Sequence, residues 1–437
     1  MPVTFLPGAV RIEPVGQVEA DVDLPGSKSL TNRYLACAAL ADGRTTIERA
    51  SLSDDAHAMV RGLRALGVDV EVDEARARLH VTGRSGGFRV EQAELDVGAA
   101  GTAMRFLAAL ACVGCGHYRL DGSQRMRARP IGDLVDALRS LGAKIECEEI
   151  EGYPPLVVHA DGLRGGEVVL ESPPSSQFIS ALLMAAPACR GDVLVDIRGA
   201  CVSEPYIAMT LEVMRELGVE SLVSDDGRRF IVPAPQRYQA GSYQVEPDAS
   251  AATYFWAAAA VTGGRVRVRG LSRASRQGDV GFVDVLAQMG CQVHTASDGL
   301  DVHGPADGRL RGVTVDLNGM PDTAQTLAAI ALFADGPTRI ENVANLRVKE
   351  TDRIAALACE LGKLGARVDT RTDGLTIYPP PACAAAEIET YDDHRMAMSF
   401  AVVGLRVPGL VIRHPDVVTK SFPGFFSRWD ALATAQR

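Results

Sequence analysis

The densest group of ionisable side chains in the sequence lies in the segment NLRVKETDRIAAL. The segment contains six polar or charged residues that lie directly before or at the start of an apolar helical run: Asn345, Arg347, Lys349, Glu350, Asp352 and Arg353. A carboxylate between cations stays ionised or is placed for proton transfer, and an arginine can hold a carboxylate or phosphate through two parallel hydrogen bonds. The segment therefore indicates either a solvated helix cap or a site that binds an anion and moves a proton.

Cations recur at the starts of other predicted helices. PGSKSLTNR places Lys28, Ser29 and Arg33 near a first turn, where a cation opposes the helix dipole unless an anion is bound. The segments GTAMR, ARPIGDL, DDHRM and VTKSFP add Arg105, Arg129, Arg395 and Lys420 at further predicted starts. Any one of these cations alone is best explained as a solvated surface residue. Their recurrence at corresponding points of a repeat favours a shared role in anion binding.

Asp322 in the segment MPDTAQTLAA has two interpretations. Gln325 follows it three residues later, which is the pattern of a capping box at a helix start. A carboxylate that faces a cationic cleft is also a candidate general base. Both interpretations stay open on the residues alone.

An internal repeat provides the elements that position these side chains. Six segments rich in Ala, Leu and Met begin 71 to 74 residues apart, at Ser29, Gly101, Ser175, Asp248, Pro321 and Asp392. Their apolar residues recur at helical spacing, which predicts buried helices. Each is followed by a short alternating run typical of a strand. A second helix then ends before a glycine in five copies, at Gly67, Gly142, Gly218, Gly290 and Gly365, where we expect the left-handed cap. The pattern predicts an α/β fold of six βαβαββ units.

The two ends of the chain belong to one predicted domain. The sixth copy stops before its last strands, while about 25 residues with strand character precede the first copy. We therefore expect the N-terminal segment to complete the last copy. Three units in each domain give one domain of residues 24–245 and another of 1–23 plus 246–437, with hinge crossings near 23–24 and 245–246. Ligand sites favour domain interfaces, so we expect the site in the interdomain cleft. A purely structural solenoid is the alternative, and it is disfavoured because the copies differ most in the polar residues at their helix starts.

Composition limits the classes of function. A length of 437 residues favours at least two domains, and a net charge of −10 gives no general basic surface for nucleic acid or an anionic membrane. No apolar stretch approaches the roughly 20 residues that span a bilayer, and no basic residue precedes an apolar run at the start. We expect a cytoplasmic chain with nine reduced cysteines, in which Cys112 and Cys115 are small buried apolar residues.

The motifs of several chemistries are missing from the sequence. It contains no GxxxxGK[ST], no GxGxxG after a strand, no GxSxG and no HExxH. No cluster of Cys or His has the spacing of a metal site. We expect an acid–base enzyme that handles two anionic substrates, with no metal and no cofactor.

Nine motifs, in order, resemble those of one enzyme family. They are PGSKSLTNR, GAAGTAMR, RMRARPI, SSQFISALLM, VSEPYI, PDTAQT, NLRVKETDR, YDDHRMAM and TKSFP, from Leu24 to Phe426. This order is similar to that of the 5-enolpyruvylshikimate-3-phosphate synthase family of the shikimate pathway. The resemblance implies an inside-out α/β barrel in each of two domains. It also implies transfer of the enolpyruvyl group of phosphoenolpyruvate to the 5-hydroxyl of shikimate 3-phosphate, with release of phosphate through a tetrahedral intermediate.

The resemblance also implies roles for individual residues. On the shikimate 3-phosphate side, mainly in the first domain, it places Lys28, Ser29, Arg33, Ser175, Ser176, Gln177, Ser203, Tyr206, Asp322, Asn345 and Lys349. On the phosphoenolpyruvate side it places Lys28, Gly101, Arg129, Gln177, Arg353, Arg395 and Lys420. Asp322 would act as general base on the 5-hydroxyl, and Glu350 with Lys28 would exchange a proton with the methylene carbon. We expect a monomer.

Two positions depart from the family pattern beside Gly101. Ala99 stands where many members have Asn, and Phe106 stands where Pro often follows the arginine. Because Gly101 would leave room beside phosphoenolpyruvate, these departures bear on sensitivity to glyphosate, the family's competitor at that site.

Three other functions stay open on the sequence. A UDP-N-acetylglucosamine enolpyruvyl transferase would share the fold and chemistry, but it uses a loop cysteine, and the stretch GSQRMRA before Arg129 has none. A relative of RNA 3′-phosphate cyclase would need nucleotide handling, which the acidic net charge disfavours. A non-catalytic anion-binding protein would not need the carboxylates Asp322 and Glu350.

Overall fold

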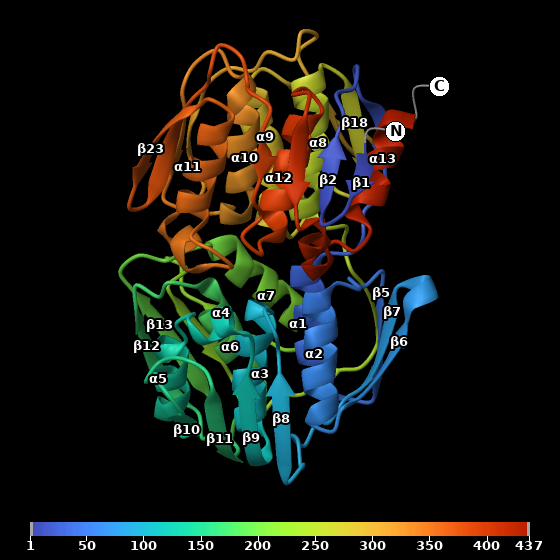
Figure 1. Ribbon diagram of the computed structural model, residues 1–437. Helices are drawn as coiled ribbons and strands as arrows, with labels where there is room; N and C mark the ends of the chain where they lie inside the picture. The colour runs from blue at the N-terminus through green and yellow to red at the C-terminus, as the bar shows by residue number, and fades with distance from the viewer. Residues whose placement is uncertain (1–2, 435–437) are drawn as a thin grey trace. The chain divides into compact units, whose positions relative to one another are not determined.

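The computed structural model describes residues 3–434 and divides into two compact units. Unit 1 contains the chain up to Pro25 together with the chain from Glu246 onward, and unit 2 is Gly26–Val245. The chain therefore passes between the units twice (Figure 1). The extreme ends of the predicted second domain, residues 1–2 and 435–437, lie outside the described residues.

Unit 2 contains three four-stranded sheets within its described residues, in the orders β17-β5-β7-β6, β10-β11-β9-β8 and β12-β13-β15-β14. Its strands are β4 (Ala41–Asp42), β5 (Arg44–Glu48), β6 (Asp69–Asp73), β7 (Arg78–Thr82), β8 (Gln92–Asp96), β9 (Cys115–Asp121), β10 (Lys144–Cys147), β11 (Leu156–Asp161), β12 (Gly166–Glu171), β13 (Val193–Arg198), β14 (Leu222–Val223), β15 (Arg229–Val232), β16 (Tyr238–Gln239) and β17 (Ser242–Gln244). Its helices are α1 (Lys28–Ala39), α2 (Asp54–Ala65), α3 (Gly101–Val113), α4 (Gln124–Arg127), α5 (Gly132–Ser140), α6 (Ser176–Ala185) and α7 (Glu204–Glu216), with 3₁₀ turns η1 (Glu74–Arg76) and η2 (Ala186–Ala188).

Unit 1 likewise has three four-stranded sheets in the described part of the chain, in the orders β1-β2-β26-β25, β19-β20-β18-β3 and β21-β22-β24-β23. Its strands are β1 (Val3–Leu6), β2 (Ala9–Ile12), β3 (Glu19–Val22), β18 (Arg265–Arg269), β19 (Gln292–Thr295), β20 (Gly299–His303), β21 (Thr314–Asp316), β22 (Thr338–Glu341), β23 (Arg367–Arg371), β24 (Gly374–Tyr378), β25 (Glu387–Ile388) and β26 (Leu410–Arg413). Its helices are α8 (Ala249–Thr262), α9 (Phe282–Gln288), α10 (Ala324–Ile330), α11 (Arg353–Lys363), α12 (His394–Gly404) and α13 (Phe425–Thr434), with 3₁₀ turns η3 (Gly278–Gly281), η4 (Pro321–Thr323), η5 (Ala331–Phe333), η6 (Ala344–Val348) and η7 (Pro415–Lys420).

The six four-stranded sheets of the described residues share one topology, which confirms the predicted repeat. In each, two parallel strands are followed by two strands that pair antiparallel, as in β8, β9, β11 and β10. The last sheet is completed by the N-terminal strands, because β2 pairs antiparallel with β26 and places Val10 opposite Ile412. The N-terminal segment therefore completes the sixth copy, as the sequence predicts.

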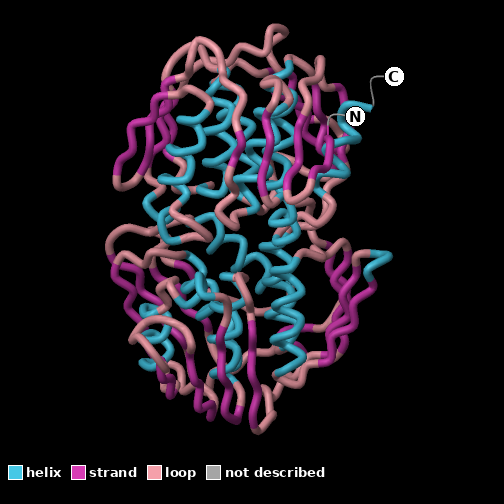
Figure 2. Tube along the Cα trace, viewed as in Figure 1, coloured by secondary structure: helices cyan, strands magenta, loops and turns pink. Residues whose placement is uncertain are grey.

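The six Ala-rich segments form buried helices, three of them in each unit. In unit 2, α1, α3 and α6 contact one another, and in unit 1, α8 contacts α10 and α12. Residues 251–262 of α8 are all buried, which explains why that helix has no polar face. Figure 2 shows the strands on the outside of each unit and the helices within. This is the inside-out arrangement that the resemblance implies.

The glycine after each second helix has the predicted backbone conformation. Gly67, Gly142, Gly218, Gly290 and Gly365 all have positive φ, between 82° and 106°. In this region a Cβ is strained, so glycine is the residue that ends these helices at low cost.

Two other sequence expectations have mixed outcomes. Cys112 is buried as predicted, but Cys115 is exposed at the start of β9, so the prediction for Cys115 is wrong. No helix in the described residues is long and apolar enough to cross a membrane.

Candidate functional site

Lys28 is the first residue of α1 in unit 2. The Ser27 side chain caps this helix by accepting a hydrogen bond from the Leu30 amide. Lys28 Nζ lies 3.0 Å from Asp55 Oδ2 in the first turn of α2, and both side chains are largely buried. The carboxylate therefore holds the Lys28 ammonium group at the helix start.

Arg33, one turn further along α1, is held by neutral acceptors. It is 2% exposed, and its Nε and Nη1 donate to Thr210 Oγ1 and the Ser29 carbonyl, both at 2.8 Å. Nη2 donates to the Tyr206 carbonyl at 3.0 Å and to Ser180 Oγ at 3.3 Å. Burial lowers the pKa of Arg33 to about 10, while Tyr206 and Cys37 oppose that shift. The structure therefore contains a desolvated positive charge that is bound by no carboxylate of residues 3–434.

Gly101 and Arg129 lie against each other. Gly101 opens α3, whose N-cap residue Ala100 makes no side-chain cap hydrogen bond. A Cβ added at Gly101 would lie 2.5 Å from Arg129 Nη1, so the buried guanidinium occupies the space that the missing side chain leaves. Arg129 is not at a helix start, and that prediction is wrong. It lies between α4 and α5, because Pro130 precedes the N-cap Ile131 and α5 begins only at Gly132.

The start of α6 adds polar groups beside α3. Ser175 caps α6 by accepting from the Gln177 amide at 3.2 Å, and Gln177 Nε2 donates to Thr102 Oγ1 at 3.2 Å. Ser176 is buried at the first position of α6. This bond joins the starts of α6 and α3, so the structure brings Gln177 beside the Gly101 turn.

Ser203 and Tyr206 lie at the start of α7. Ser203 is buried and has the left-handed backbone conformation, with φ of 58°, directly before the helix. Such a conformation costs a serine of order 1 kcal/mol or more, and strained residues of this kind cluster at functional sites. Tyr206 lies in the first turn, and its ring centroid is 5.9 Å from the Arg33 guanidinium carbon.

In unit 1, Asp322 lies among three cations. Its Oδ2 is 2.6 Å from Arg395 Nη2, and its Oδ1 is 3.2 Å from Arg353 Nη1 and 3.8 Å from Lys349 Nζ. Of the two interpretations of Asp322, the capping box is wrong. Asp322 belongs to the 3₁₀ turn η4, whose N-cap is Met320 and which makes no side-chain cap hydrogen bond. The carboxylate instead makes ion pairs with these cations.

Arg353 is the central cation of this cluster. It is 1% exposed at the start of α11, with Nε 2.7 Å from Asp393 Oδ2 and Nη2 2.9 Å from Glu350 Oε2. Burial disfavours its charged form, but the carboxylates of Asp393, Glu350 and Asp322 outweigh burial and raise the pKa of Arg353. The guanidinium therefore stays charged and links all three carboxylates.

Sequence reasoning missed Asp393. This aspartate is buried, and its Oδ1 also accepts from the Arg395 amide at 2.9 Å, so it caps α12. Its place directly before His394 and Arg395 in DDHR was an available signal, because an aspartate before a buried helix is a frequent N-cap.

Glu350 links Arg353 to a further cation. Its Oε1 lies 3.6 Å from Lys420 Nζ. Lys420 is the last residue of the 3₁₀ turn η7, so the prediction that it stands at a helix start is wrong. Asn345 lies in η6, and its buried Oδ1 has no hydrogen-bond partner among the described residues. An acceptor of this kind suits a donor supplied by a ligand, since leaving it unpaired costs about 1–3 kcal/mol.

Arg395 has a second contact behind the cluster. Its Nη1 lies 3.3 Å from the Tyr254 hydroxyl of α8. Burial raises the pKa of Tyr254 to about 12, although Arg395 opposes that shift. Tyr254 therefore keeps its proton at neutral pH, and its uncharged hydroxyl is the hydrogen-bond partner that positions Arg395.

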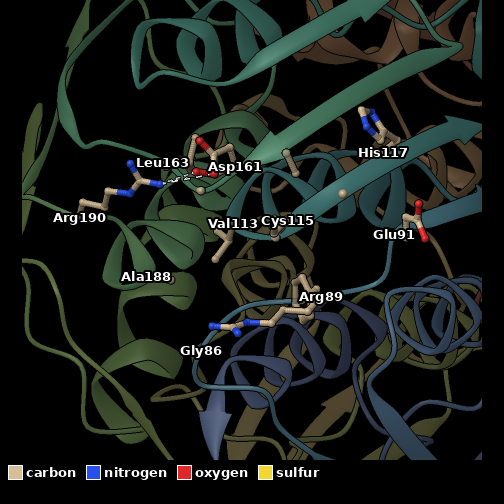
Figure 3. A pocket seen from close by; sticks show the side chains of 15 residues that line it. Gly86, Arg89, Glu91, Val113, Cys115, His117, Asp161, Leu163, Ala188 and Arg190 are labelled. Atoms are coloured by element: carbon tan, nitrogen blue, oxygen red, sulfur yellow. Dashed lines mark hydrogen bonds and ion pairs between the residues drawn. The ribbon is translucent and has the colours of Figure 1, made fainter.

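A separate cavity in unit 2 contains none of the predicted site residues. It measures about 850 Å³, and Figure 3 shows that Val113, Cys115, His117 and Arg190 are among its lining residues. Val113 is the last residue of α3, whereas Gly101 is its first, so the two lie about 18 Å apart along the helix. The cavity is therefore distinct from the polar helix starts.

Comparisons with known proteins cover nearly the whole chain. Residues 12–429 match the family model for EPSP synthase (3-phosphoshikimate 1-carboxyvinyltransferase). A 3-phosphoshikimate 1-carboxyvinyltransferase from Sulfurovum sp. is 48% identical over 98% of this chain and 99% of its own length. One from Trichormus variabilis is 47% identical over 94% of this chain and 96% of its own. A solved structure of EPSP synthase from Acinetobacter baumannii superimposes with a TM-score of 0.79 at 26% identity, over 97% of each chain.

Proposed function

The chain belongs to the EPSP synthase family, and we propose that it transfers the enolpyruvyl group of phosphoenolpyruvate to the 5-hydroxyl of shikimate 3-phosphate. The observation that carries this proposal is the pair of carboxylates Asp322 and Glu350 on one buried arginine, Arg353. The reaction needs two proton-transfer groups, one for a hydroxyl and one for a carbon, close to cations that bind anions.

In the addition step, Asp322 accepts the proton of the 5-hydroxyl as its oxygen bonds to C2 of phosphoenolpyruvate. The electrons of the C2–C3 double bond take a proton at C3, supplied by Glu350 with Lys28. In the elimination step C3 returns a proton to Glu350 with Lys28, the C2–C3 double bond re-forms, and the bond from C2 to the phosphate oxygen breaks. The proton that Asp322 accepted leaves with the phosphate, so the acceptor gains the enolpyruvyl group and the proton-transfer groups return to their starting states.

We propose the same division of binding residues that the resemblance implies. Shikimate 3-phosphate would contact Lys28, Ser29, Arg33, Ser175, Ser176, Gln177, Ser203, Tyr206, Asp322, Asn345 and Lys349. Phosphoenolpyruvate would contact Lys28, Gly101, Arg129, Gln177, Arg353, Arg395 and Lys420. The burial of Arg33, Arg129, Arg353, Arg395 and Lys420, each at most 7% exposed, supports this assignment, because desolvated cations bind anions strongly.

Three broader properties complete the proposal. The chain crossings between the predicted domains, near 23–24 and 245–246, would act as a hinge, the protein would be a monomer, and it would work in the cytoplasm. The first is tested by limited proteolysis at the crossings with and without both substrates. Light scattering tests the second, with a mass of 46.4 kDa expected. Fractionation of cells that express the native gene tests the third.

One assay tests the activity itself. Phosphate release from phosphoenolpyruvate is measured with shikimate 3-phosphate and, separately, with UDP-N-acetylglucosamine as acceptor. We expect release with the first acceptor only, and its loss in Asp322→Ala. Release with UDP-N-acetylglucosamine alone would favour the sugar-nucleotide enolpyruvyl transferase, and release with neither would favour a non-catalytic anion-binding protein.

A further inference from the structure

Asp279 is a buried carboxylate of unit 1 that the proposed reaction does not yet use. It lies in the 3₁₀ turn η3 and is 2% exposed. Its Oδ2 accepts a hydrogen bond from Ser250 Oγ in the first turn of α8. A buried carboxylate is costly unless it is hydrogen-bonded or paired with a charge.

The surroundings place Asp279 next to the Asp322 turn. Both η3 and η4 pack against α8. A Cβ added at Gly281, the last residue of η3, would lie 3.5 Å from the sulfur of Met320, the residue directly before η4. The two 3₁₀ turns that carry Asp279 and Asp322 are therefore neighbours.

Charged groups from three elements act on Asp279. They are Asp322 of η4, Asp248 at the N-cap of α8 and Arg395 of α12. Burial first, and then the charge of Asp322, raise the pKa of Asp279 to about 6, with Asp248 adding to the shift. The Ser250 hydrogen bond and Arg395 oppose it. Asp279 and Asp322 therefore repel each other when both are ionised.

This repulsion and the cations around Asp322 have opposite effects on the proton affinity of the Asp322 carboxylate. Arg353, Arg395 and Lys349 favour the ionised form of the Asp322 carboxylate, and a carboxylate so stabilised is a poor proton acceptor. A negative charge from η3 opposes that effect.

We propose that Asp279 is a positioning residue whose negative charge keeps the Asp322 carboxylate basic enough to take the proton of the acceptor hydroxyl. The proposal rests on the proposed function, because it assigns to Asp322 the role of general base. It adds a residue that contacts neither substrate and acts only through Asp322.

The test compares pH profiles of kcat for phosphate release. In Asp279→Asn, which keeps the shape of the side chain but not its charge, we expect kcat at pH 7.5 to fall about 10-fold. We also expect the acidic limb of the profile to move to lower pH, because Asp322 then holds a proton less tightly. The KM for each substrate should stay within about twofold, since Asp279 contacts neither.

Ser250→Ala provides a milder form of the same change. Without the hydroxyl that stabilises its charged form, Asp279 keeps its proton to higher pH and less negative charge acts on Asp322, so the acidic limb should again move to lower pH, but by less than in Asp279→Asn. Asp284→Asn is the matched control, because Asp284 is an exposed aspartate nearby on α9 whose partner is Arg273. We expect the wild-type profile for that control.

The outcomes separate this proposal from the proposed function. Shifts to lower pH in both variants, larger in Asp279→Asn, support it. An active wild type whose profile keeps its shape in both variants overturns the role of Asp279 and leaves the proposed function standing. Shifts to higher pH, or losses of activity with thermal destabilisation and no change in shape, indicate a structural residue and also overturn it. An inactive wild type overturns the proposed function and this role with it.

Discussion

Two buried arginines, Arg33 in unit 2 and Arg353 in unit 1, have opposite surroundings. Hydroxyls and carbonyls hold Arg33, whereas the carboxylates of Asp393, Glu350 and Asp322 surround Arg353. Burial lowers the pKa of Arg33, and the carboxylates raise that of Arg353 despite burial. An anionic ligand can therefore neutralise the charge of Arg33, while the charge of Arg353 is already paired with three carboxylates, two of which we propose move protons.

The difference explains how one chain can both bind anions and perform acid–base chemistry. A carboxylate close to every binding cation would repel an anionic substrate. A cluster with cations alone would lack a base.

Asp322→Asn should have the largest effect on rate. The amide keeps the shape of the side chain but cannot accept the hydroxyl proton, so kcat should fall about 10²- to 10⁴-fold. Steady-state kinetics measures the loss, and thermal unfolding checks that the variant folds. A decrease smaller than about fivefold would remove Asp322 from the role of base.

Arg353→Met should destabilise the protein more than Arg33→Met. The first change leaves three carboxylates without their buried cation and should cost about 3–5 kcal/mol. The second leaves only neutral acceptors unpaired and should cost about 1–3 kcal/mol.

Urea unfolding measures the free energy of unfolding of both variants. Tryptophan fluorescence reports on unit 1, because both tryptophans, Trp256 and Trp429, are buried there, and far-UV circular dichroism reports on the whole chain. Equal losses would mean that the two arginines have equivalent surroundings, contrary to the comparison.

The stability of unit 1 should depend on pH through Asp279. Burial and Asp322 raise its folded pKa from 3.8 to about 6. The contribution of Asp279 to the free energy of unfolding is therefore fully present below pH 3.8 and is lost as the pH rises through about 6.

Asp279→Asn removes this titration. We expect the variant to gain stability relative to wild type between pH 4 and pH 7, by about 1–3 kcal/mol. Urea unfolding followed by tryptophan fluorescence at several pH values measures the gain. A difference between the two proteins that is independent of pH would show that Asp279 has the same proton affinity in the folded and unfolded chains.

Gly101→Ala should have the smallest effect. The added methyl group would meet the Arg129 guanidinium, which lies at the end of a flexible side chain and can move. We expect a KM for phosphoenolpyruvate raised by about 3- to 10-fold and little loss of stability. Glyphosate binding should weaken more than catalysis does, as inhibition constants beside kcat would show. Equal losses of both would contradict the prediction.

The sequence predicted the repeated elements better than the contacts between them. Apolar spacing and Gly67, Gly142 and their counterparts are local signals, and the structure confirms the helices and caps that they predict. The capping interpretation of Asp322, one of two that the sequence left open, fails because a 3₁₀ turn precedes α10. Asp393 and Asp279 were missed because their partners are far away in sequence. Arg353 precedes Asp393 by 40 residues, and Asp279 meets Ser250 across 29.

The path of the bridging oxygen tests the proposed reaction most directly. Phosphoenolpyruvate labelled with ¹⁸O between C2 and phosphorus is turned over with shikimate 3-phosphate in D₂O, and the products are examined by mass spectrometry. Addition and elimination predict ¹⁸O in the released phosphate and deuterium in the methylene group of the product. Label that stays on the enolpyruvyl carbon, with no deuterium in the product, would contradict the account.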